Sequence, residues 1–140
     1  MLKSLYELSD ADKQLLLSSL PFISSELDLF VIKFYSYFLK TDAVSLFHKT
    51  HMEQQYRMFH ASLGVIITHI DNPEFLEEHL NSIVSKHASY GVKNIHTEYF
   101  VEAFMNALND IFGKNFKTYK ELWYIVIRDI MNYFALKLVN

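Results

Sequence analysis

Glycine and proline are scarce in this sequence, with three glycines and two prolines among 140 residues. A β-sandwich or β-barrel of this length needs many tight turns, which these two residues usually form. Apolar residues recur instead with a helical period, most clearly between Met52 and Ile70. The sequence therefore predicts an all-α fold.

The length of the chain predicts one domain, residues 1–140. Hydrophobic residues make up 51% of the sequence and aromatic residues 16%, so the chain can bury a large core and is not disordered. The sequence predicts six helices, or seven if the short segment 41–47 is counted. This segment is expected to be a turn of helix or a corner. The six helices span residues 9–21, 24–40, 52–70, 74–90, 95–112 and 118–139, and Pro21 is expected to stop the first.

Charge and residue usage exclude several classes of protein. A formal net charge of −3, with no cluster of Lys and Arg, argues against nucleic-acid binding. The absence of cysteine excludes disulfides, thiol nucleophiles and thiolate-bound metal clusters. The N-terminus lacks the unbroken apolar segment of a secretory signal. The most hydrophobic stretches of the chain are too short or too charged to span a bilayer. We expect a cytoplasmic protein with no nucleic-acid or membrane partner, as a monomer or weak dimer.

Motifs for hydrolytic or phosphoryl-transfer chemistry are missing. The sequence contains no G-x-S-x-G, no glycine-rich phosphate loop and no H-E-x-x-H, and its carboxylates lie near helix starts or on polar faces. A hydrolase, a kinase or a nucleotide enzyme is therefore disfavoured.

Among the seven histidines, His87 stands apart because its neighbours on the predicted helical face are aliphatic. An imidazole buried there without a partner would cost a few kcal/mol, about the desolvation penalty of a buried polar group. Either a hydrogen bond in the core satisfies His87, or a metal or metallocofactor does. His48 and His51 could also face one metal, but no third ligand stands at a convincing spacing.

The order of several segments resembles a known family. Phe34-Tyr35, Leu46-Phe47, the stripe 52–70, then Lys86-His87-Ala88-Ser89-Tyr90-Gly91-Val92 and finally Trp123 follow the layout of bacterial single-domain globins. The globin portion of flavohaemoglobins is especially similar. The resemblance implies a globin fold, with the helices packed around a pocket for haem b.

The resemblance assigns roles to particular residues. His87 corresponds to the proximal ligand of the haem iron, and Phe47 to the corner phenylalanine on the haem face. Tyr35 and Gln55 correspond to distal hydrogen-bond donors, and Phe59 to the apolar distal residue. The remaining expected haem contacts are Lys86, Val92 and Phe100.

Alternatives stay open for the distal side. Tyr35 could be a core tyrosine satisfied by a backbone carbonyl, and Gln55 could point to solvent. His51 or His60 would be the distal residue if the register of the helix differs.

Three departures separate this sequence from flavohaemoglobins. The spacing from Tyr35 to Phe47 is two residues shorter than expected. Thr97 and Leu138 occupy the positions of the tyrosine and glutamate that support the proximal histidine in that family. Without this support the histidine donates less electron density, which favours reversible binding over oxidative chemistry.

The sequence thus predicts a haem protein that binds O₂ reversibly, as a carrier, reserve or scavenger. One alternative is a nitric-oxide dioxygenase that works with a separate reductase, and another is a haem-based gas sensor. NO and CO are further expected ligands.

Overall fold

The computed structural model describes residues 2–47 and 51–138, and this part of the chain is helical throughout, with no strand. Its seven α-helices confirm the predicted all-α class. They are α1 (Lys3–Tyr6), α2 (Asp10–Ser25), α3 (Leu27–Phe38), α4 (Met52–Thr68), α5 (Pro73–Ser89), α6 (Asn94–Phe112) and α7 (Phe116–Leu138), with two short 3₁₀ helices, η1 (Asp42–Phe47) and η2 (Gly113–Asn115).

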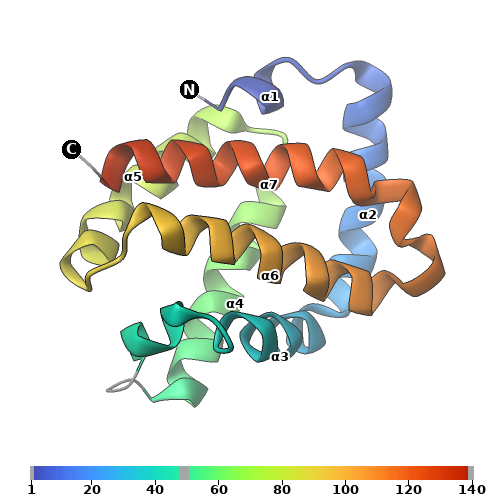
Figure 1. Ribbon diagram of the computed structural model, residues 1–140. Coiled ribbons are helices and arrows are strands. Elements are labelled where there is room, and N and C mark those ends of the chain that lie inside the picture. Colours follow the sequence, from blue (N-terminus) through green and yellow to red (C-terminus); the bar gives the residue numbers. More distant parts are fainter. Residues whose placement is uncertain (1, 48–50, 139–140) are drawn as a thin grey trace.

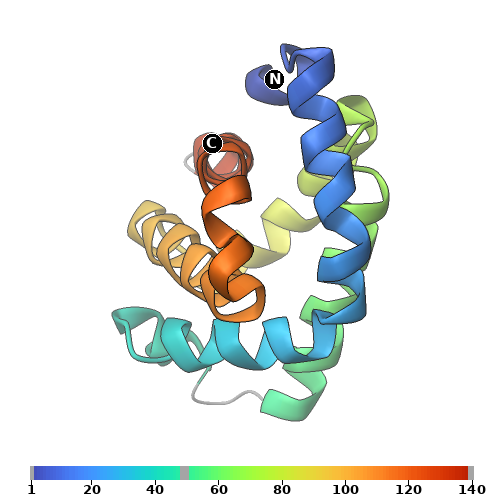
Figure 2. The same cartoon turned by 90° about the vertical axis from the view of Figure 1, so that its right-hand side faces the viewer.

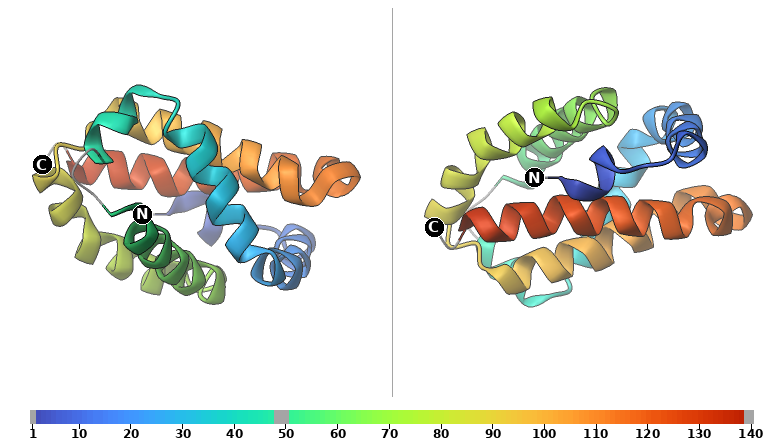
Figure 3. Two further views of the ribbon diagram at one scale, coloured as in Figure 1. Left: turned by 90° about the horizontal axis from the view of Figure 1, so that it is seen from below. Right: turned by 90° about the horizontal axis from the view of Figure 1, so that it is seen from above.

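The last two long helices, α6 and α7, form an antiparallel pair at the centre of the molecule (Figure 1). Helix α3 crosses α6 on one side of this pair, while α2 and α5 pack against α7. Helix α4 packs on α3 and α2 and lies away from the central pair (Figure 3). The core between these layers holds Phe30, Phe34, Leu108, Trp123 and Val126, all of which are buried.

Pro21 lies inside α2, so the prediction that it stops the first helix is wrong. Proline removes one backbone donor and disfavours a helical residue before it, which is a local penalty. Buried side chains on both sides of it, Leu16 and Ile23, belong to the core and hold the helix together across the proline. The helix ends at Ser25 instead.

Glu26 separates α2 from α3, and the chain bends there by 89° (Figure 2). No side chain caps the start of α3, and Ser25 Oγ donates to the Phe22 carbonyl of its own helix. No single helix within residues 2–47 and 51–138 is long and apolar enough to cross a membrane, and α2 and α3 reach that length and hydropathy only when taken together.

Both ends of α5 follow from local chemistry. Asn72 caps α5 by accepting the Phe75 N–H, and Pro73 occupies the first helical position, where its missing donor costs nothing. Gly91 follows α5 with a φ of +87°, a conformation that glycine adopts without strain.

Candidate functional site

Tyr35 and Gln55 form a direct pair between α3 and α4. Gln55 Nε2 donates to the Tyr35 hydroxyl oxygen at 2.9 Å. Because the tyrosine oxygen accepts this bond, its own O–H remains available, and no acceptor for it exists in the described part of the chain. Tyr35 is only 2% exposed, so the pair presents a buried donor that no group within residues 2–47 and 51–138 accepts.

Burial also fixes the protonation state of this tyrosine. Loss of solvent raises the pKa of Tyr35 to about 12, although the hydrogen bond from Gln55 acts in the opposite direction. The phenol therefore remains neutral, and remains a donor, at any physiological pH.

Aromatic rings surround the pair. Phe47 meets the Tyr35 ring edge-on at 5.9 Å between centroids, and Phe59 does so at 5.5 Å. Phe100 on α6 lies 5.8 Å from Phe59. Phe47, Phe59 and Phe100 are only half buried although they pack against the core. Four predicted site residues thus lie in one cluster with Tyr35, held by η1, α3, α4 and α6.

His87 lies near the end of α5, away from this cluster. Its Nδ1 lies 2.9 Å from the Ile83 carbonyl oxygen. A carbonyl can only accept, so Nδ1 carries the proton and Nε2 of the neutral ring keeps its lone pair. The ring is half buried and meets Phe134 of α7 edge-on, with centroids 5.2 Å apart.

The end of α5 fixes the position of this histidine. The Val92 N–H donates to the His87 carbonyl, and the Gly91 N–H donates to the Ala88 carbonyl. These two bonds form a Schellman motif, which needs the positive φ of Gly91. Of the two predicted contacts beside His87, Val92 is half buried and Lys86 is exposed.

No hydrogen bond or ring contact joins His87 to the Tyr35 cluster among residues 2–47 and 51–138. Helix α4 packs against α3 and α2, whereas α5 packs against α7. Helices α4 and α5 do not pack against each other along their lengths. One polar contact connects them, between Ser62 Oγ and His79 Nε2 at 3.3 Å. The structure therefore places the predicted residues in two groups, one around Tyr35 and one at the end of α5.

The other histidines occupy different surroundings. His60 Nε2 lies 2.9 Å from Asp28 Oδ1 in a solvent-exposed contact between α4 and α3, and within the described residues no hydrogen bond joins it to Tyr35 or Gln55. His51 is exposed at the start of α4. His48 lies outside the described residues, and the remainder of the chain contains no cluster of three metal-ligating side chains.

Neither Thr97 nor Leu138 forms a hydrogen bond with the His87 imidazole in the described residues. Thr97 is buried, but its Oγ1 donates to the Asn94 carbonyl rather than to His87. Leu138 has no polar group to offer. The Ile83 carbonyl is thus the hydrogen-bond partner of the His87 imidazole.

Sequence reasoning missed three aromatic neighbours of the site. Phe34 lies at the centre of the cluster, 4.7 Å from Phe59 and 4.8 Å from Phe100. The Tyr56 ring lies tilted against the Tyr35 ring with centroids 5.1 Å apart, and the Phe134 ring meets His87 edge-on. A helical stripe marks such residues as core, but it does not show which of them line one site.

The comparison with family models matches residues 32–134 to the globin family. The chain belongs to the globin family. This assignment confirms the predicted globin fold. No curated protein matches the sequence significantly.

A solved structure supports the same fold. This globin is similar to an engineered carbene transferase from Rhodothermus marinus, derived from a protein to which nitric oxide dioxygenase activity is attributed. The two share 21% sequence identity over 94% of each chain, with a TM-score of 0.81. At this identity the likeness establishes the fold alone.

The residues of this globin fit a haem group, which globins generally bind. His87 offers an unprotonated Nε2 with its opposite nitrogen hydrogen-bonded, as metal-ligating histidines usually do. Half-buried apolar side chains on η1, α4 and α6 suit a flat hydrophobic macrocycle. The unsatisfied Tyr35 donor suits a polar ligand beside it.

Proposed function

We propose that this globin binds haem b through His87 and binds O₂ reversibly, as a cytoplasmic oxygen carrier, reserve or scavenger. The observation that carries this proposal is the free O–H of Tyr35 in a buried position. A buried donor without a partner costs about 1–3 kcal/mol, and a ligand that accepts its hydrogen bond removes this cost. The haem iron supplies the reversible binding of a diatomic gas, which protein side chains cannot provide.

The chain supplies the surroundings of that gas. A bound O₂ carries partial negative charge, so it accepts hydrogen bonds strongly. The Tyr35 hydroxyl is the first donor, and the second N–H of the Gln55 amide is another. Phe47, Phe59 and Phe100 keep water from this region, which strengthens each of these bonds.

The state of His87 favours reversible binding. Its Nδ1–H meets the neutral Ile83 carbonyl and no carboxylate, so the ring gains little additional basicity. A less basic ligand favours release of intact O₂ over its reduction.

The test compares two histidines with the same local hydrogen bond. His69 Nδ1 lies 2.9 Å from the Val65 carbonyl, as His87 Nδ1 does from Ile83. Absorption spectra of reduced and oxidised protein should show a haem Soret band. His87→Gly should lose stable haem and regain it with added imidazole, while His69→Gly should keep the wild-type spectrum. Wild-type haem spectra in His87→Gly would overturn the role of His87.

A second candidate is nitric oxide dioxygenation, in which bound O₂ oxidises NO to nitrate. The shared fold with the Rhodothermus marinus structure favours this candidate, because nitric oxide dioxygenase activity is attributed to the parent of that protein. These 140 residues contain no flavin or nicotinamide motif, and a reductase would supply the electron that each turnover needs. Sustained NO consumption with an added reductase, with one O₂ consumed and one nitrate formed per NO, would favour this activity over reversible binding.

A further inference from the structure

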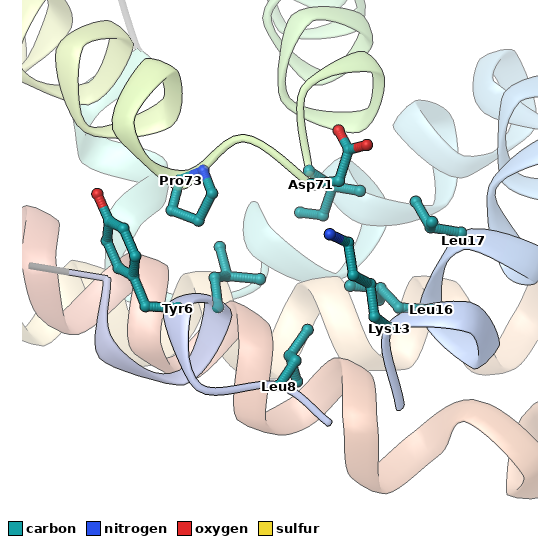
Figure 4. A pocket seen from close by; sticks show the side chains of 9 residues that line it. Tyr6, Leu8, Lys13, Leu16, Leu17, Asp71 and Pro73 are labelled. Atoms are coloured by element: carbon teal, nitrogen blue, oxygen red, sulfur yellow. The ribbon is translucent and has the colours of Figure 1, made fainter. Parts of the chain in front are cut away.

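A second feature of the molecule lies far from the haem residues, beneath the N-terminal helix. There, α1 covers a cavity of about 160 Å³ between α2 and the turn that joins α4 to α5 (Figure 4). Its walls are mostly aliphatic and come from Leu5, Leu8, Leu16, Leu17, Ile70 and Pro73. An engineered apolar cavity of about 150 Å³ holds one benzene molecule, so this space suits a side chain of three or four carbons.

Hydrogen bonds hold the helix that covers the cavity in place. The Leu2 N–H and the Tyr6 hydroxyl both donate to the carboxylate of Glu77 on α5, at 2.8 and 3.1 Å. The Ser4 N–H and hydroxyl donate to Asp129 on α7, at 3.0 and 2.8 Å. The cavity is therefore already formed, and a ligand need not pay to order it.

Two opposite charges, both exposed to solvent, line the cavity. Lys13 extends from α2 toward the turn that carries Asp71 (Figure 4). The two side chains line the same space, yet they form no ion pair with each other and have no other hydrogen-bond partner within residues 2–47 and 51–138. A ligand with one anionic and one cationic group satisfies both. A ligand with a carboxylate alone would leave Asp71 unpaired and place two negative charges close together.

We propose that this cavity binds a small aliphatic α-amino acid. Its side chain occupies the aliphatic interior, its carboxylate meets the Lys13 ammonium, and its ammonium meets the Asp71 carboxylate. The site is independent of haem and of the proposed gas binding, so its failure would leave that proposal untouched.

The experiment is a calorimetric titration of the full-length protein with L-leucine. We expect saturable binding with a dissociation constant of about 1 mM or lower, a modest affinity for so small a ligand. Three analogues each lack one part of leucine. Glycine lacks the aliphatic side chain, 4-methylpentanoate lacks the amine, and 3-methylbutylamine lacks the carboxylate. Each of the three should bind at least about tenfold more weakly.

Variants locate the binding. Lys13→Gln and Asp71→Asn should each weaken leucine binding roughly three- to tenfold, because each removes one charge-assisted bond at a partly wet site. Leu8→Trp should fill the cavity and abolish binding without altering the melting of the free protein. Lys120→Gln, an exposed site on α7, is the matched control and should bind as the wild type does.

The outcomes decide between a zwitterion site and a plain apolar void. No saturable leucine binding would overturn the proposal. So would equal binding of either singly charged analogue, or full affinity in both Lys13→Gln and Asp71→Asn.

Discussion

At Tyr35 a single hydrogen bond decides what the residue can do. The phenol oxygen accepts from Gln55, so the phenol hydrogen remains for a ligand. Had Tyr35 bonded a backbone carbonyl, as a core tyrosine often does, this hydrogen would be used. Within residues 2–47 and 51–138 the Tyr35 hydroxyl bonds the Gln55 amide and no backbone carbonyl, which supports the distal role that we propose for it.

Replacing Tyr35 with Phe should speed O₂ release. A hydrogen bond to a partly charged ligand contributes about 1–3 kcal/mol, which corresponds to roughly 5- to 150-fold in the dissociation rate. Gln55→Leu should have a smaller effect. Stopped-flow measurements of O₂ and CO release check this, because CO carries less charge and should dissociate at nearly the wild-type rate. A similar acceleration for both gases would indicate a packing defect instead.

The protonation state of Tyr35 predicts how O₂ release depends on pH. The protonated phenol alone can donate, so its contribution is present below its pKa of about 12 and is lost as the pH rises through that value. From about pH 6 to about pH 10, where an ordinary tyrosine begins to ionise, the O₂ dissociation rate should stay flat. A rise in that rate near pH 10 that is absent in Tyr35→Phe would contradict this.

At the scale of single helices, α6 begins with an unusual cap. The Lys93 N–H donates to Nδ1 of His96 at 2.9 Å, so Nδ1 must be unprotonated for the cap to form. Burial and the nearby charge of Lys93 lower the pKa of His96, while Asp42 acts in the opposite direction. The start of α6 is therefore sensitive to acid.

His96→Ala should remove this cap and reduce acid sensitivity. Losing the acceptor should lower the free energy of unfolding by about 0.5–2 kcal/mol at pH 8, the usual range for a helix cap. The unfolded histidine takes up a proton near pH 6.5 and the folded one only at lower pH, so wild-type stability falls as pH falls below about 6.5. Burial also lowers the pKa of His79, so the variant still loses the part of its stability in acid that depends on His79. Urea titrations at several pH values would contradict the prediction if both proteins lost stability equally.

At the scale of the whole molecule, one polar contact joins distant parts of the chain through the core. Trp123 Nε1 on α7 donates to Ser19 Oγ on α2 at 3.0 Å, and Ser19 in turn donates to the Leu16 carbonyl. Ser19 and Trp123 are 1% and 2% exposed. The contact therefore sets how α2 lies on α7 without leaving a buried donor unsatisfied.

Ser19→Ala should destabilise the protein by about 1–3 kcal/mol, because it leaves the Trp123 N–H buried without an acceptor. Ser18→Ala is the matched control, since the exposed Ser18 hydroxyl bonds only the Leu15 carbonyl of its own helix. It should change stability by less than about 0.5 kcal/mol. Chemical denaturation measures both, and equal losses would show that the buried contact contributes nothing specific.

The sequence by itself determined the helical class and most helix ends. The stripe from Met52, the cap at Asn72 and the turn at Gly91 follow from local chemistry, because period, capping and positive φ depend on residues a few positions apart. The order of the globin-like segments also predicted that His87 lies near the end of its helix. These features need no knowledge of the rest of the fold.

Only the tertiary structure decided the continuation of α2 through Pro21, the partner of Tyr35 and the placing of His87 in a group apart from the Tyr35 cluster. Each depends on contacts between residues far apart in sequence, such as Gln55 with Tyr35 or Trp123 with Ser19. A residue pattern records which side of a helix is apolar, but not which helix will meet it. Packing between helices outweighed the local penalty of Pro21 for the same reason, since many buried contacts exceed the loss of one backbone hydrogen bond.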